Sequence, residues 1–143
     1  MAVVLVWKDG TEDSLLGNVA LATEMKKAGE DVTIIITEEA LAAVGGGRAF
    51  GWSQALKDRP SRLTALKAAK EMGLDYHRDF DPRWSDTGKL IAHARASGVR
   101  LVADPIWAKL LGIDGNLRGE VERIETKDML KALREASVVV GGF

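Results

Sequence analysis

Residues 98–113, GVRLVADPIWAKLLGI, constrain the fold more than any other part of the chain. The apolar run 99–103 predicts a buried strand. Asp104 follows as a helix N-cap, because its carboxylate can accept hydrogen bonds from the free N–H groups of the first turn. Pro105 suits the first helical position, since it has no N–H to lose and its φ is preset, and Gly112 ends the helix. Open α/β proteins build their sites where a strand runs into a helix N-terminus in this way.

The rest of the chain alternates apolar runs with amphipathic helical patterns. The run at residues 2–7 is continuously apolar and rich in valine, which indicates a strand covered on both faces, as in a parallel sheet. Strands that alternate with helices predict an α/β fold in which helices cover both faces of a mainly parallel sheet. Five strands are expected, at residues 2–7, 31–37, 99–103, 119–124 and 137–140. Helices are expected at residues 14–28, 38–44, 61–72, 86–96 and 126–136, in addition to the helix that follows Asp104.

Length and composition favour one domain over residues 1–143. Apolar residues make up 46% of the chain and charged residues 29%, which is typical of soluble globular proteins. The formal net charge of −1 gives no reason to expect a nucleic acid or an acidic membrane as partner. The apolar run at the N-terminus is too short for a signal peptide or a membrane span, so we expect a cytoplasmic protein with no membrane association.

The chain contains no cysteine, which excludes disulfides, thiolate metal sites and persulfide chemistry on its own residues. The glycine run 45–47 followed by Arg48 is similar to a phosphate-binding turn, but Phe50 breaks the GxGxxG spacing. The His-x-Asp-x-Asp pattern at residues 77–81 offers acceptable metal ligands, yet no second cluster accompanies it. We therefore expect no metal and no cofactor.

The order of elements from residue 99 onward resembles the DsrE/DsrF-like family of sulfur-relay proteins. Its members share a strand, a residue at the strand end that is often cysteine, and a short helix that ends in Gly-Ile or Gly-Val. The matching positions here are Leu101-Val102-Ala103-Asp104, Ile106-Trp107-Ala108 and Gly112-Ile113. A short strand, a helix and a final apolar strand that ends in Phe143 follow in a similar order. The region 45–84 is longer and more aromatic than is usual in the family.

The resemblance implies a three-layer α/β/α, flavodoxin-like sheet. It also implies assembly into homotrimers or homohexamers, with other DsrE-like subunits as further partners. Active members pass persulfide sulfur from the cysteine at the strand end. Asp104 occupies that position here, and a carboxylate cannot carry a persulfide. We therefore expect a cysteine-free, DsrE-like oligomer that binds a small ligand or a partner protein rather than transferring sulfur.

The carboxyl ends of parallel strands meet at one edge of a sheet, so this edge is where a ligand is expected. Trp7 and Trp107 would line a pocket there, and Lys8 or Arg48 would supply the positive charge for a small anionic ligand. The same tryptophans equally suit core packing or a subunit interface. The expected ligand-binding residues are Trp7, Lys8, Asp9, Arg48, Asp104 and Trp107.

Two alternative functions remain open. In the first, Asp104 is the acid or base of an enzyme that acts on a small anionic substrate, which requires a carboxylate tuned by burial. In the second, the chain is a non-catalytic subunit that shapes a shared pocket in a sulfur-relay complex with cysteine-bearing relatives. A purely structural role of Asp104 as a helix cap is compatible with both.

Overall fold

The computed structural model describes residues 1–45, 50–74, 76 and 86–141. Five strands form one sheet in the order β4-β3-β2-β1-β5, and every neighbouring pair is parallel. The predicted α/β fold is therefore confirmed, and the sheet is parallel throughout rather than mainly parallel. The strands are β1 (Ala2–Trp7), β2 (Asp31–Ile36), β3 (Arg100–Ala103), β4 (Glu122–Arg123) and β5 (Val138–Val140). The helices are α1 (Glu12–Lys27), α2 (Glu38–Gly45), α3 (Arg59–Glu71), α4 (Thr87–Ala96), α5 (Pro105–Leu110) and α6 (Thr126–Glu135), with a 3₁₀ turn η1 (Gln54–Leu56).

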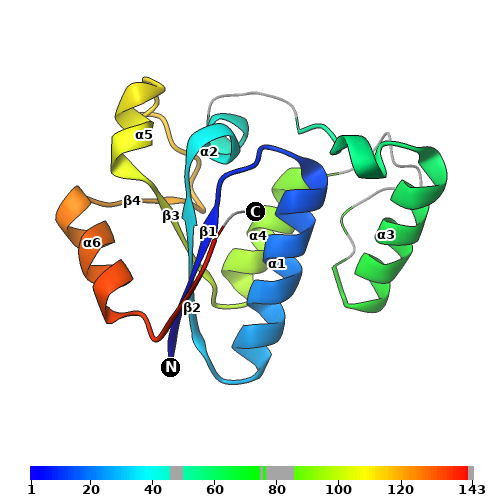
Figure 1. Cartoon of the computed structure of the whole chain (residues 1–143), viewed down its shortest axis with the longest axis horizontal. Helices are drawn as coiled ribbons and strands as arrows, with labels where there is room; N and C mark the ends of the chain where they lie inside the picture. The colour runs from blue at the N-terminus through cyan, green and yellow to red at the C-terminus, as the bar shows by residue number, and fades with distance from the viewer. Residues whose placement is uncertain (46–49, 75, 77–85, 142–143) are drawn as a thin grey trace.

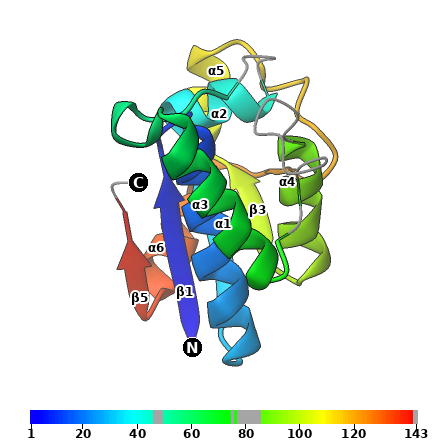
Figure 2. The same cartoon turned by 90° about the vertical axis from the view of Figure 1, so that its right-hand side faces the viewer.

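Helices cover both faces of the sheet and give the expected three layers (Figure 1). α1 and α4 lie on one face, and α3 lies outside them, as the side view in Figure 2 shows. The main core fills this side, where Leu5, Ile34 and Leu101 of the three central strands are buried. α6 covers the opposite face, where Met129 and Val4 belong to a smaller buried cluster.

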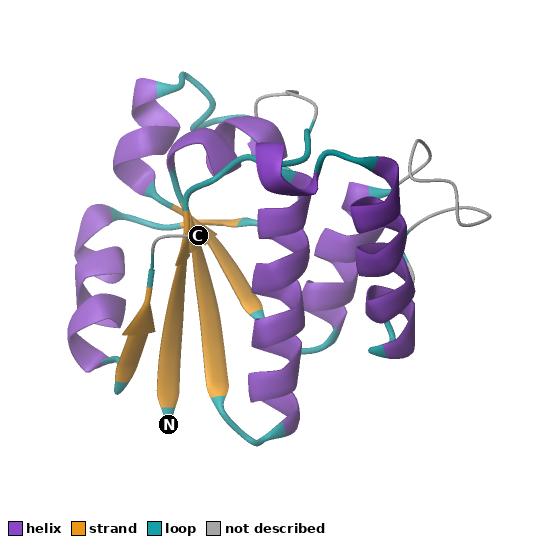
Figure 3. Ribbon diagram, turned by 45° about the vertical axis from the view of Figure 1, so that its right-hand side comes forward, coloured by secondary structure: helices purple, strands orange, loops and turns teal. Residues whose placement is uncertain are grey.

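The carboxyl ends of the strands point to the end of the molecule where α2 and α5 lie (Figure 3). The turn after β1 packs tightly on the start of α2 there. A Cβ atom on Gly10 would lie 2.8 Å from the carbonyl oxygen of Glu39, so only glycine fits without a shift. The Ala40 N–H donates to the Lys8 carbonyl (2.9 Å), and Glu38 adopts a φ of 53°, in the left-handed region that side chains rarely enter. This edge is thus built from closely fitted backbone.

Several element boundaries differ from the predictions by one or more residues, and two of these differences have a clear local cause. α1 begins at Glu12 rather than at residue 14, because the Thr11 hydroxyl oxygen caps the helix and accepts a hydrogen bond from the Ser14 N–H (3.2 Å). β4 is shorter than the predicted strand 119–124, because the Val121 N–H donates to the Arg118 carbonyl (3.1 Å) and closes a turn before the strand begins.

Candidate functional site

Asp104 joins the ends of two strands at the carboxyl edge. Its Oδ1 accepts hydrogen bonds from the N–H groups of Ile106 (2.9 Å) and Trp107 (3.4 Å), which caps α5, and Pro105 stands in the first helical turn. Its Oδ2 accepts a hydrogen bond from the hydroxyl of Thr37 at the end of β2 (2.8 Å). Thr37 is buried and Asp104 is half-buried, so this bond is partly shielded from water. The predicted cap is confirmed, and both carboxylate oxygens have partners.

Trp7 is part of the core rather than of an open surface. Its side chain is 2% exposed, and its indole N–H donates to the Asp9 carbonyl (2.7 Å). Its ring stacks on Phe50, with centroids 6.1 Å apart and planes inclined by 10°. Of the two interpretations of this residue, the contacts support core packing, because a ligand would reach the indole only if the core opened.

The remaining predicted site residues differ in their exposure. Lys8 and Asp9 are exposed at the end of β1. Trp107 is half-buried on α5 and packs against the main core. Among the described residues Trp7 stacks on Phe50 and not on Trp107, and Arg48 lies outside those residues.

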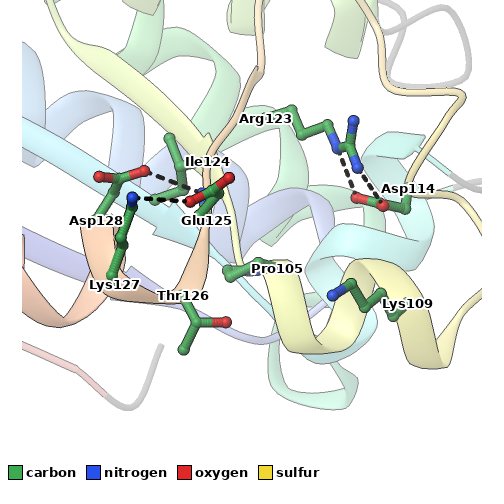
Figure 4. A pocket seen from close by; sticks show the side chains of 9 residues that line it. All are labelled: Pro105, Lys109, Asp114, Arg123, Ile124, Glu125, Thr126, Lys127 and Asp128. Atoms are coloured by element: carbon green, nitrogen blue, oxygen red, sulfur yellow. Dashed lines mark hydrogen bonds and ion pairs between the residues drawn. The ribbon is translucent and has the colours of Figure 1, made fainter.

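A hollow of about 700 Å³ opens beside α5, between that helix, the end of β4 and the start of α6 (Figure 4). Pro105, which directly follows Asp104, forms part of its wall, so the hollow adjoins the predicted edge of the sheet. Most of its lining is polar or charged. The lining residues are Pro105, Lys109, Asp114, Arg123, Ile124, Glu125, Thr126, Lys127 and Asp128.

The cations of this lining are not equally neutralised. The Arg123 guanidinium donates two hydrogen bonds to Asp114 (3.0 and 2.8 Å), and this contact raises the pKa of Arg123. The Lys127 ammonium lies 3.3 Å from Oε2 of Glu125. Lys109 forms no ion pair with any residue that the structure describes, and Figure 4 shows its ammonium turned toward the hollow. An anion in the hollow would therefore meet an ammonium that no carboxylate pairs with directly, in a lining that holds three cationic and three anionic side chains.

The first turn of α6 is already capped by its own side chains. Glu125 is the N-cap residue, and the Asp128 carboxylate accepts a hydrogen bond from the Glu125 N–H (3.2 Å). A ligand would consequently depend on Lys109 more than on the end of this helix.

Sequence reasoning selected Asp104 and missed Lys109 and Arg123. Arg123 lies at the end of the predicted strand 119–124 and Glu125 directly follows it, so the carboxyl-edge argument that selected Asp104 would also have selected them. Lys109 carries no such signal, because the direction of its side chain depends on how α5 packs against its neighbours.

Two kinds of feature are absent from the described residues. No helix among them is long and apolar enough to cross a membrane. No group of three or more histidine, aspartate or glutamate side chains within them is placed to hold a metal ion. The His-x-Asp-x-Asp pattern at residues 77–81 lies outside this part of the chain.

Comparisons with known proteins bear on the fold. No family model matches the sequence, and no curated protein matches it. Among solved structures, the chain is similar to the YchN protein of E. coli, with a TM-score of 0.59, 14% sequence identity and coverage of 99% of both chains. At this identity the likeness shows the fold alone: the chain has the expected DsrE-like, flavodoxin-like α/β architecture.

Proposed function

We propose that this chain is a cysteine-free DsrE-like protein that binds a small anionic ligand in the hollow beside α5 and does not transfer sulfur. The observation that carries the proposal is the Lys109 ammonium, which has no ion-pair partner among the described residues and faces a hollow of about 700 Å³. That volume falls within the range of roughly 300–1,000 Å³ typical of small-molecule sites. The lack of cysteine supports the second half of the proposal, since no residue can carry a persulfide.

The lining also limits the kind of anion. Asp114, Glu125 and Asp128 add carboxylates around the same space, and these would repel a multiply charged ligand. A ligand with one anionic group for Lys109 and a hydroxylated remainder fits best, because the polar lining can hydrogen-bond hydroxyl groups. Arg123 has five N–H donors and gives two of them to Asp114, which leaves others for a ligand oxygen.

Isothermal titration calorimetry with glycerate, inorganic phosphate and citrate tests this specificity, with glycerol as the uncharged control. We expect glycerate to bind more tightly than citrate and glycerol to show no binding. Lys109→Met keeps the aliphatic stem and removes the charge, and it should weaken glycerate binding at least tenfold, or about 1.4 kcal/mol. Lys131→Met, at an exposed lysine of α6 outside the hollow, is the matched control. Equal affinities of the two variants would refute the role of Lys109.

Sulfur transfer is tested separately. The purified protein should transfer no sulfane sulfur from thiosulfate to cyanide above the protein-free rate, and a robust rate would contradict the proposal.

An acid or base role for Asp104 has less support, because its two carboxylate oxygens already accept hydrogen bonds from the first turn of α5 and from Thr37. Assembly into a homotrimer or homohexamer, alone or with cysteine-bearing DsrE-like subunits, and a cytoplasmic location belong to the same proposal. A native mass spectrum of the protein purified from its own cells would measure the assembly and any bound ligand together.

A further inference from the structure

Most polar residues around the hollow beside α5 are engaged in contacts with one another, which Figure 4 draws as dashed lines. These residues are Asp114, Arg123, Glu125, Lys127 and Asp128. The other two polar side chains of the lining are Lys109 and Thr126. Both are exposed, and neither side chain forms a hydrogen bond or an ion pair with any residue that the structure describes. The hollow therefore offers one ammonium and one hydroxyl to a ligand.

Lys109 and Thr126 approach the hollow from different helices. Lys109 belongs to α5, and Thr126 is the first residue of α6. Figure 4 shows the Lys109 ammonium and the Thr126 hydroxyl pointing toward one another, with Pro105 between them. The Thr126 hydroxyl is not needed to cap its helix, because Glu125 is the N-cap residue. A ligand that contacts both groups must therefore present two polar groups at opposite ends.

We propose that Thr126 determines which anion the hollow selects, by forming a hydrogen bond with a hydroxyl group at the end of the ligand remote from its carboxylate. This inference rests on the proposed function, in which Lys109 binds the anionic group. The threonine hydroxyl can donate to the ligand hydroxyl or accept from it. Pro105 and Ile124, the apolar members of the lining, can contact the carbon chain between the two ends. The ligand class is thus a short carboxylic acid with a hydroxyl on its last carbon.

The residues around Thr126 favour a neutral group at this end of the ligand. Glu125 precedes it in the chain, and Asp128 belongs to the same lining. The Lys127 ammonium is already paired with Glu125 (3.3 Å). A second carboxylate on the ligand would be repelled by the two acidic side chains, whereas a hydroxyl carries no charge. A dicarboxylate of the same length should therefore bind less tightly than the hydroxy acid.

Two isomers of hydroxybutyrate test the inference, because they differ only in the position of the hydroxyl. Dissociation constants are measured by NMR chemical-shift titration for γ-hydroxybutyrate and α-hydroxybutyrate, with butyrate and succinate as reference anions. We expect γ-hydroxybutyrate to bind about two- to tenfold more tightly than butyrate, which is the gain that one neutral hydrogen bond gives. α-Hydroxybutyrate should bind no more tightly than butyrate, and succinate should bind less tightly than γ-hydroxybutyrate.

Three variants connect this preference to one side chain. Thr126→Val keeps the shape of the side chain and removes its hydroxyl, so it should abolish the preference for γ-hydroxybutyrate and leave the affinity for butyrate unchanged. Thr126→Ser retains the hydroxyl and should keep the preference. Thr87→Val is the matched control, because Thr87 is likewise the first residue of a helix, α4, and lies outside the hollow. It should bind all four anions as the natural protein does.

The outcomes separate this inference from the proposed function. If Lys109→Met weakens butyrate binding but Thr126→Val leaves the preference for γ-hydroxybutyrate unchanged, the ligand proposal holds and the role of Thr126 is overturned. Equal affinities of the natural protein for γ-hydroxybutyrate and α-hydroxybutyrate would overturn that role as well. If none of the carboxylates binds, or if Lys109→Met binds them as tightly as the natural protein, both proposals are overturned.

Discussion

Asp104→Ala tests whether Asp104 stabilises the fold by capping α5 and by accepting the hydrogen bond from Thr37. Loss of an N-cap typically costs about 0.5–2 kcal/mol of folding free energy. Loss of a hydrogen bond to a charged group costs about 1.5–3 kcal/mol, and the Thr37 hydroxyl would remain buried without its partner. Because one carboxylate makes both contacts, the two effects overlap, and we expect a total loss of about 2–4 kcal/mol. With an m-value near 2 kcal/mol/M, the urea midpoint should fall by about 1–2 M.

Asp104→Asn is the control for this prediction. Asparagine caps helices as well as aspartate does, and its amide can donate to the Thr37 hydroxyl, so we expect a loss below about 1 kcal/mol. Adding Thr37→Val to Asp104→Ala closes a double-mutant cycle that isolates the contact between the two side chains. A loss below about 0.5 kcal/mol for Asp104→Ala at an unchanged m-value would refute the reasoning, because neither the helix cap nor the hydrogen bond from Thr37 would then contribute to the folding free energy.

Two further predictions concern buried and tightly packed positions. Burial, followed by the charge of Glu12 and a hydrogen bond to it (3.0 Å), raises the pKa of Tyr76 far above its ordinary value. Since Tyr76 is the only tyrosine of the chain, absorbance at 295 nm should stay flat up to about pH 11 in the native protein and rise near pH 10 in urea. The unfolded chain releases this proton first, so stability should fall as the pH rises above about 10, and a native titration near pH 10 would contradict the burial. Gly10→Ala should cost about 1–3 kcal/mol, because its Cβ would meet the Glu39 carbonyl, whereas Gly17→Ala on the exposed face of α1 should stabilise by about 0.5–1 kcal/mol. Urea midpoints compare the two, and equal effects would contradict the packing argument.

Local signals determined most of the fold, and the sequence-based predictions failed where contacts between distant parts of the chain decide the outcome. The cap at Asp104 is a contact between near neighbours in sequence, so the order of residues 99–105 was enough to predict it. Trp7 had two interpretations, because its environment depends on Phe50, which returns from a distant part of the chain to stack on it. The same reason explains Lys109: a sequence shows that it lies on a short helix, but only the packing of α5 shows the direction of its ammonium.

Asp104 therefore does two things at once in this chain. The carboxylate of Asp104 fastens the start of α5 to β2 through Thr37, and α5 in turn carries Lys109 into the hollow. Stability and ligand binding should consequently weaken together when Asp104 is changed, since a loosened α5 no longer holds the ammonium in place.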